Sequence, residues 1–139
     1  MGVTVTGRVR SRYTGPGRRL PRYDQYMDDL SKAVRRAIRE LAGLAHEREL
    51  AAELTKLRAE FEAWSAGQIT PFELQQVIHE FHDGVSRQLY NRYTSGSTLP
   101  HVVAAAVVRG TISVAEIPEP ARKQLDRLIE RLSEAGLEE

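Results

Sequence analysis

The feature that most constrains the fold is an uninterrupted apolar run from Val102 to Val108. A helix over this run has apolar side chains on every side, so it has no polar face to turn toward water. The run is far shorter than the roughly 20 apolar residues that a bilayer-spanning helix needs. Pro100 suits the first helical position, and Gly110 suits the left-handed position after the last turn. The sequence therefore predicts a buried central helix against which other elements pack.

Two segments carry the pattern that is typical of a helix N-terminus. Thr70 is followed three residues later by Glu73, and Ser113 is followed at the same spacing by Glu116. In such a capping box the hydroxyl accepts a hydrogen bond from a backbone N–H of the first turn, while the carboxylate accepts one from the N–H of the capping residue. We expect a helix to begin at each segment. Pro118 should stop the second helix within about a turn.

Apolar residues at helical spacing extend from Tyr23 to about residue 65, in two stripes that are out of step. Either one long helix changes the face that it buries, or a tight hairpin within residues 43–47 divides it. We favour the long helix, because those residues have poor turn chemistry. It would run about 60 Å, so we expect a second subunit to cover part of it in a homodimer. The stripe residues are Met27, Leu30, Val34, Ile38, Leu41 and Ala45, then Leu50, Leu54, Leu57, Phe61 and Trp64.

The second half of the chain reads as further helices. One should run from Thr70 to about Tyr93, and an amphipathic last helix should follow Pro120 and end at Gly136. We therefore predict an all-α fold: a small helical bundle with a long N-terminal helix or helical hairpin and a buried central helix. Residues 23–139 form a single domain in this prediction.

Residues 1–22 differ sharply in charge from the rest of the chain. They carry six arginines and no acidic residue, a charge of +6, whereas the remainder has 14 basic and 19 acidic side chains, a charge of −5. We predict an extended basic N-terminal arm with three open roles: a mobile terminus, a segment that lies across the acidic body of its own or a neighbouring subunit, or a nucleic-acid-binding element. The arginines are Arg8, Arg10, Arg12, Arg18, Arg19 and Arg22.

Candidate chemistry outside the arm is limited to two groups of residues. Arg87, Arg92 and Arg109 fall at or near the ends of expected helices, where the helix dipole favours cations, and they would form an anion site if they converge in space. His79, His82 and Asp83 share one side of a helix and could bind a transition metal if a further ligand came from elsewhere. Ordinary boundary histidines look the same, so we assign no metal ligand, no cofactor and no catalytic residue.

Composition supports a cytoplasmic protein of bacterial origin. The chain has no cysteine, its apolar runs are too short for a membrane span, and it has 17 arginines to 3 lysines, a bias that suits a GC-rich genome. From the long stripes and the polarised charge we expect a non-enzymatic, self-associating protein–protein interaction or regulatory module. The alternatives are a nucleic-acid-binding accessory protein that uses the arm, and a metal-dependent enzyme built around His79 and His82.

Overall fold

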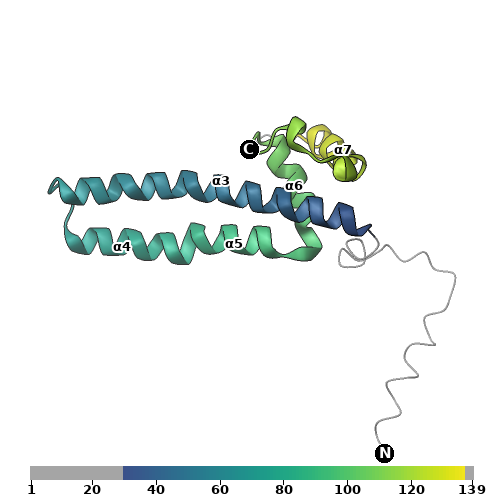
Figure 1. Cartoon of the computed structure of the whole chain (residues 1–139). Coiled ribbons are helices and arrows are strands. Elements are labelled where there is room, and N and C mark those ends of the chain that lie inside the picture. The colour runs from purple at the N-terminus through teal and green to yellow at the C-terminus, as the bar shows by residue number, and fades with distance from the viewer. Residues whose placement is uncertain (1–29, 137–139) are drawn as a thin grey trace, which may run out of the picture.

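A computed structural model of the chain describes residues 30–136. Its dominant feature is an antiparallel helical hairpin (Figure 1). The first arm is helix α3 (Lys32–Ser65). The second arm is a continuous helical run of three parts: α4 (Pro71–Phe81), a π-helical turn η3 (His82–Ser86) and α5 (Arg87–Thr94).

The chain then leaves the hairpin and covers one part of it. A 3₁₀ turn η4 (Gly96–Thr98) leads into α6 (Leu99–Val108), which crosses α3 and carries the chain to the side where α7 (Glu119–Glu134) lies (Figure 1). A short 3₁₀ turn, η5 (Val114–Glu116), forms the corner between α6 and α7. The described residues contain helices and turns but no strand, which confirms the all-α prediction for this part of the chain. The predicted basic arm, residues 1–22, lies outside the described residues.

Helix α3 settles the alternative that the sequence left open, because it runs unbroken through residues 43–47. The preference for one long helix over a tight hairpin at that point is confirmed. The helix begins at Lys32, where the backbone N–H of Val34 donates to the Ser31 hydroxyl at 3.3 Å. This start is later in the chain than Tyr23, where the helical pattern of the sequence begins. The predicted stripe residue Met27 lies outside the described residues.

Both capping boxes form. At the hairpin end, the N–H of Glu73 donates to the Thr70 hydroxyl at 3.1 Å, and the N–H of Thr70 donates to the Glu73 carboxylate at 3.4 Å. At the second corner the N–H of Ser113 donates to the Glu116 carboxylate at 2.9 Å. The helix that starts there is only the single turn η5, because Pro118 follows directly after Ile117.

The π-helical turn was not predicted, since the sequence indicated one regular helix from Thr70 to Tyr93. Phe81, Val85, Leu89 and Tyr93 recur every four residues, a wider spacing than the 3.6 residues of an α-helical turn. A regular α-helix would rotate these side chains progressively away from α3. The wider turn of residues 82–86 takes up the excess, and Leu89 and Tyr93 are buried.

The hydrophobic core lies at one end of the hairpin only. It joins the first half of α3 to α5, α6 and α7 through Ile38, Val103, Ile112 and Leu125, all fully buried. We call this part the body. The rest of the hairpin, residues 50–81 of α3, α4 and the loop between them, we call the distal hairpin. Its only buried residue is Leu74, which does not belong to the core. Helix α3 is therefore packed against other helices of the core along its first half, and it is largely exposed along its second half.

Helix α6 is the central element that the sequence predicted, although it is not buried on every side. Helices α3, α5 and α7 contact it, and Val103, Ala104 and Ala106 are fully buried. A strip at three-residue spacing, Val102, Ala105 and Val108, remains half-buried. The packed helices therefore surround α6 incompletely.

We expect Ala104→Asp to destabilise the body severely, because its carboxylate would be buried without a partner. The loss should be on the order of 4 kcal/mol, a large share of the stability of a small domain. The control is Ala59→Asp on the exposed surface of α3, which should lose only about 0.5 kcal/mol through helix propensity. Urea unfolding followed by circular dichroism measures both. Equal losses would contradict the position of the core.

Candidate interaction site

A single carboxylate, that of Glu49, marks the boundary between the body and the distal hairpin. It accepts hydrogen bonds from Arg109 at 2.8 Å and from the Thr111 hydroxyl at 3.3 Å. Arg92 on α5 donates to its other oxygen at 3.4 Å. Its side chain is only 18 % exposed. Glu49 therefore ties the middle of α3 to α5 and to the C-terminal end of α6, and we call this group the Glu49 junction.

The electrostatics of the junction keep Glu49 ionised. Burial raises the pKa of its carboxyl, but hydrogen bonds from Arg109 and Tyr93 and the charges of Arg109 and Arg92 more than offset this, so the pKa lies below its ordinary value. Burial and the neighbouring Glu49 carboxylate raise the pKa of Tyr93 to about 12. The Tyr93 ring stacks on His46, with ring centroids 5.7 Å apart. Tyr93 is therefore a neutral hydrogen-bond partner at neutral pH.

The neighbouring residue on α3, Arg48, fixes the corner between α6 and α7. Its guanidinium group forms two hydrogen bonds to the Glu116 carboxylate, at 2.5 and 2.8 Å, and donates to the Thr111 carbonyl at 2.8 Å. Glu116 is also the acceptor of the capping box, so one carboxylate serves both contacts. The hydrogen bonds from Arg48 and from the Ser113 backbone lower the pKa of Glu116 to about 2.

Beyond the junction, the two helices of the distal hairpin enclose a shallow groove of about 290 Å³. A second hollow, of about 300 Å³, lies beside Glu49 and Arg92 and shares Glu53 and Val85 with it. We call the first the acidic groove. Its apolar lining residues are Leu57, Val77, Phe81 and Val85, and its charged ones are Glu53, Lys56, Glu60 and Glu80.

The charges of the acidic groove are only partly balanced. Lys56 pairs with Glu53 at 2.9 Å, one helical turn away. Glu60 on α3 and Glu80 on α4 form no ion pair with any residue of the described part of the chain, and Glu80 accepts only a neutral hydrogen bond, from Gln76 at 3.0 Å. Two uncompensated carboxylates thus line a groove with an apolar floor.

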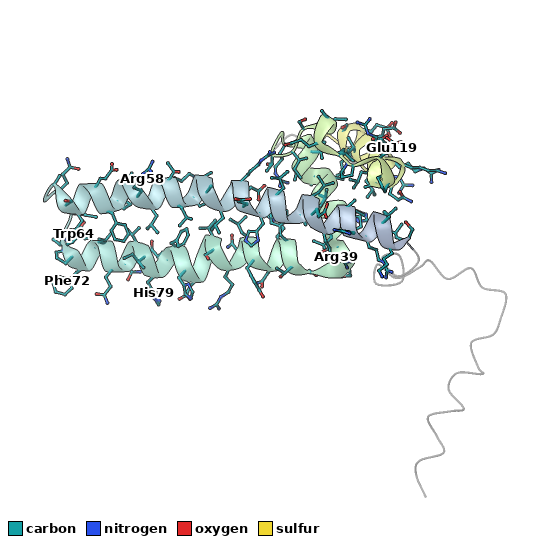
Figure 2. The ribbon with its side chains drawn as sticks, viewed as in Figure 1. Arg39, Arg58, Trp64, Phe72, His79 and Glu119 are labelled. Carbon is teal, nitrogen blue, oxygen red and sulfur yellow. The ribbon has the colours of Figure 1, made fainter. Side chains whose placement is uncertain are left out.

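Large apolar side chains follow the other edge of the distal hairpin. Leu54, Phe61 and Ile78 are 46 %, 41 % and 39 % exposed, and none of them lines the acidic groove. At about 100° per residue, Leu54 and Phe61 lie on the opposite side of Leu57 from Glu53 and Glu60. We call these three residues the apolar edge. Phe72 is more exposed still, at 81 %, but it points away from α3 (Figure 2).

The predicted anion candidates are brought together only in part. Arg92 and Arg109 converge, but on Glu49, whose carboxylate occupies the point where their guanidinium groups meet. Arg87 lies one helical turn from Asp83 and pairs with it at 3.4 Å. Sequence reasoning missed Glu49 itself, since a lone glutamate beside the stripe residue Leu50 gives no local signal of a contact with α6.

The predicted metal candidates lie on the outer surface of the hairpin. His79 Nε2 is 3.0 Å from Asp83 Oδ2, and both side chains are exposed, with His79 on the side of α4 away from α3 (Figure 2). His82 is also exposed. Within residues 30–136, no three histidine or carboxylate side chains gather closely enough to hold a metal ion. The six arginines of residues 1–22 lie outside the described residues.

Comparisons of the chain with protein-family models, with curated proteins and with solved structures give no match. None of the helices between residues 30 and 136 combines the length and the apolar character needed to cross a membrane.

The Glu49 junction predicts how stability depends on pH. Because the folded-state pKa values of Glu49 and Glu116 lie below their unfolded values, their ionised forms stabilise the fold at neutral pH. This contribution should be lost as the pH falls from 4.5, the ordinary pKa of a glutamate, toward about 2. Glu49→Gln should lower stability at pH 7 by about 1 kcal/mol and flatten this acid dependence.

The measurement is the thermal midpoint between pH 2 and pH 7. Glu47→Gln is the control, because it removes the same charge from an exposed position of α3 that forms no ion pair in the described structure. Its thermal midpoint should depend on pH in the same way as that of the parent chain. If Glu49→Gln keeps the full acid dependence of the parent, the junction does not hold the body together in the way described.

Proposed function

We propose that the protein is a non-enzymatic, self-associating interaction module whose distal hairpin pairs with that of a second copy. The observation that carries this proposal is the exposure of Leu54, Phe61 and Ile78 along one edge of the hairpin. Two paired hairpins form a four-helix bundle, in which each helix buries its apolar stripe between its neighbours. In the dimer, Leu54, Phe61 and Ile78, which are exposed in the single chain, become buried between the two hairpins.

An isolated helical hairpin is a poor structure in water, since two helices cover each other along one line only. In the body, α6 and α7 supply the missing cover for α3. In the distal hairpin no described element does so, and Leu74 is its only buried residue. A helix of 34 residues is about 51 Å long, and the exposed apolar residues lie along its second half. The second copy is the element that this half lacks.

Charge favours the apolar edge over the acidic groove as the contact between copies. A two-fold dimer brings the same surface of both copies together. If the acidic grooves met, Glu60 and Glu80 would face their own counterparts, and like charges at close range are unfavourable. The apolar edge meets itself without this penalty, because Leu54, Phe61 and Ile78 pack against equivalent uncharged side chains.

The small size of the contact favours a weak dimer. The distal part of α3 is about 24 Å long, and a pair of helices is about 20 Å wide, so each copy buries roughly 500 Å². The total of about 1,000 Å² is at the lower limit of specific interfaces. We therefore expect a reversible dimer with a dissociation constant on the order of micromolar, which suits a regulatory contact better than a permanent one.

The sequence supports a cytoplasmic setting in a bacterium for this module. A chain without cysteine needs no oxidising compartment, and the excess of arginine over lysine suits a GC-rich genome. A non-enzymatic role is consistent with the engagement of Arg92 and Arg109 by Glu49 and of His79 by Asp83, since the candidate reactive groups serve contacts within the chain.

Light scattering of the full chain over a concentration series tests the proposal. The mass should rise from 15.7 kDa toward twice that value. The double variant Leu54→Gln/Phe61→Gln should weaken the dimer at least about tenfold, because each substitution removes apolar contact from both copies. Circular dichroism establishes that the variant is folded.

Phe72→Gln is the matched control, because it removes a more exposed apolar side chain from the outer side of α4. This variant should dimerise like the parent chain. A parent chain that stays monomeric at every concentration would overturn the proposal. A dimer that Phe72→Gln disrupts and the double variant leaves intact would overturn the assignment to the apolar edge.

A further inference from the structure

The acidic groove has features that self-association does not use. Its floor is apolar, and its walls carry two carboxylates, those of Glu60 and Glu80, that form no ion pair within the described residues. A ligand that fits must bring positive charge to the walls and apolar groups to the floor. Arginine side chains meet both needs. The guanidinium group forms bidentate hydrogen bonds with carboxylates, and the aliphatic part of the side chain packs on apolar surface.

We propose that the acidic groove binds the arginine-rich segment of the same molecule, around residues 8–13. In this segment Arg8, Arg10 and Arg12 alternate with Val9, Ser11 and Tyr13. In an extended conformation this alternation directs the arginines to one side and the other residues to the opposite side. Bound in the groove, the arginines lie against Glu60 and Glu80, and their aliphatic stems pack on the apolar floor.

The charges of the two partners are complementary. Residues 1–22 carry +6. The distal hairpin, residues 50–81, has five acidic side chains (Glu53, Glu60, Glu62, Glu73 and Glu80) and two basic ones (Lys56 and Arg58), a charge of −3. A single exposed ion pair contributes little to binding. Binding therefore needs several pairs at once, and the tether between segment and groove raises their effective concentration.

The length of the chain allows the segment to reach the groove of its own molecule. Leu57, in the middle of the groove, lies 25 residues beyond the start of α3 at Lys32, which is about 38 Å along the helix. The 20 residues from Arg12 to Lys32 span up to about 66 Å when extended. Arg12 and the residues before it are therefore within reach. The ten residues from Arg22 to Lys32 span up to about 33 Å when extended, so Arg22 reaches only the near end of the groove, at Glu53.

This inference does not depend on the proposed dimer. The acidic groove and the apolar edge have no residue in common, so the segment can bind whether or not the chain dimerises. The proposed dimer can therefore be wrong while the binding of the arginine-rich segment is right, and the reverse also holds.

Paramagnetic relaxation enhancement on the full chain tests the inference. Because the chain has no cysteine, Ser11→Cys gives a single attachment site for a nitroxide. We expect strong broadening of the amide signals of residues 53–60 and 77–85, and weak effects on the amides of α7. Added salt should reduce the broadening, because it screens the ion pairs. Broadening that is absent, or spread evenly over the body, would overturn the proposal.

Two pairs of variants separate specific binding from general attraction. Glu60→Gln/Glu80→Gln should reduce the broadening several-fold. Glu47→Gln/Glu62→Gln removes the same charge from exposed positions of α3 that do not line the groove, and it should leave the broadening in place. Equal effects of the two pairs would contradict a defined site. In a mixture of ¹⁵N-labelled chains without a nitroxide and unlabelled chains with one, all carrying Leu54→Gln/Phe61→Gln so that they do not pair through the apolar edge, we expect no broadening. Broadening in this mixture would assign the segment to a second copy and overturn binding within one molecule.

Discussion

The hydrogen bonds that converge on the Glu49 carboxylate connect the middle of α3 to α5 and to the C-terminal end of α6. Arg109, at the end of α6, reaches Glu49 at the middle of α3, and Arg48 beside it holds the corner through Glu116. These contacts lie near the middle of α3. Most of the stability comes from the apolar body, in which no charged side chain is buried. The junction lies at the boundary between the half of α3 that this body covers and the half that it leaves exposed.

The consequence is a molecule with two different halves. At the body end, α3 has α5, α6 and α7 as neighbours, and its side chains from Val34 to Ala45 are buried. At the other end only α4 and η3 accompany it, and Leu54 and Phe61 face solvent. One half contains the hydrophobic core, and the other has an exposed apolar edge and an acidic groove. We propose that the apolar edge binds a second copy and that the acidic groove binds the arginine-rich segment.

Local features of the fold were predictable from the sequence, whereas contacts between distant residues were not. The capping boxes at Thr70 and Ser113 and the left-handed Gly110, with φ of +83°, depend on residues a few positions apart. The pairing of Glu49 with Arg109 spans 60 residues and has no local signature. The π-helical turn keeps Leu89 and Tyr93 facing α3. Its position could not be predicted from the spacing of apolar residues alone. The sequence predicted that Arg92 and Arg109 could belong to an anion site. It did not predict that the Glu49 carboxylate lies between them. The exposed second half of α3 was predicted only indirectly, from the length of the helix relative to a compact domain.

The most direct test of this account is the hydrogen exchange of the α3 backbone at low and high protein concentration. Amides of residues 34–48 are held by the body and should exchange at the same slow rate at both concentrations. Amides of residues 50–65 should exchange fast in dilute solution and become protected as the concentration rises, because a second copy then covers them. Uniform protection along α3 that does not depend on concentration would contradict the account, since the distal half would then need no partner.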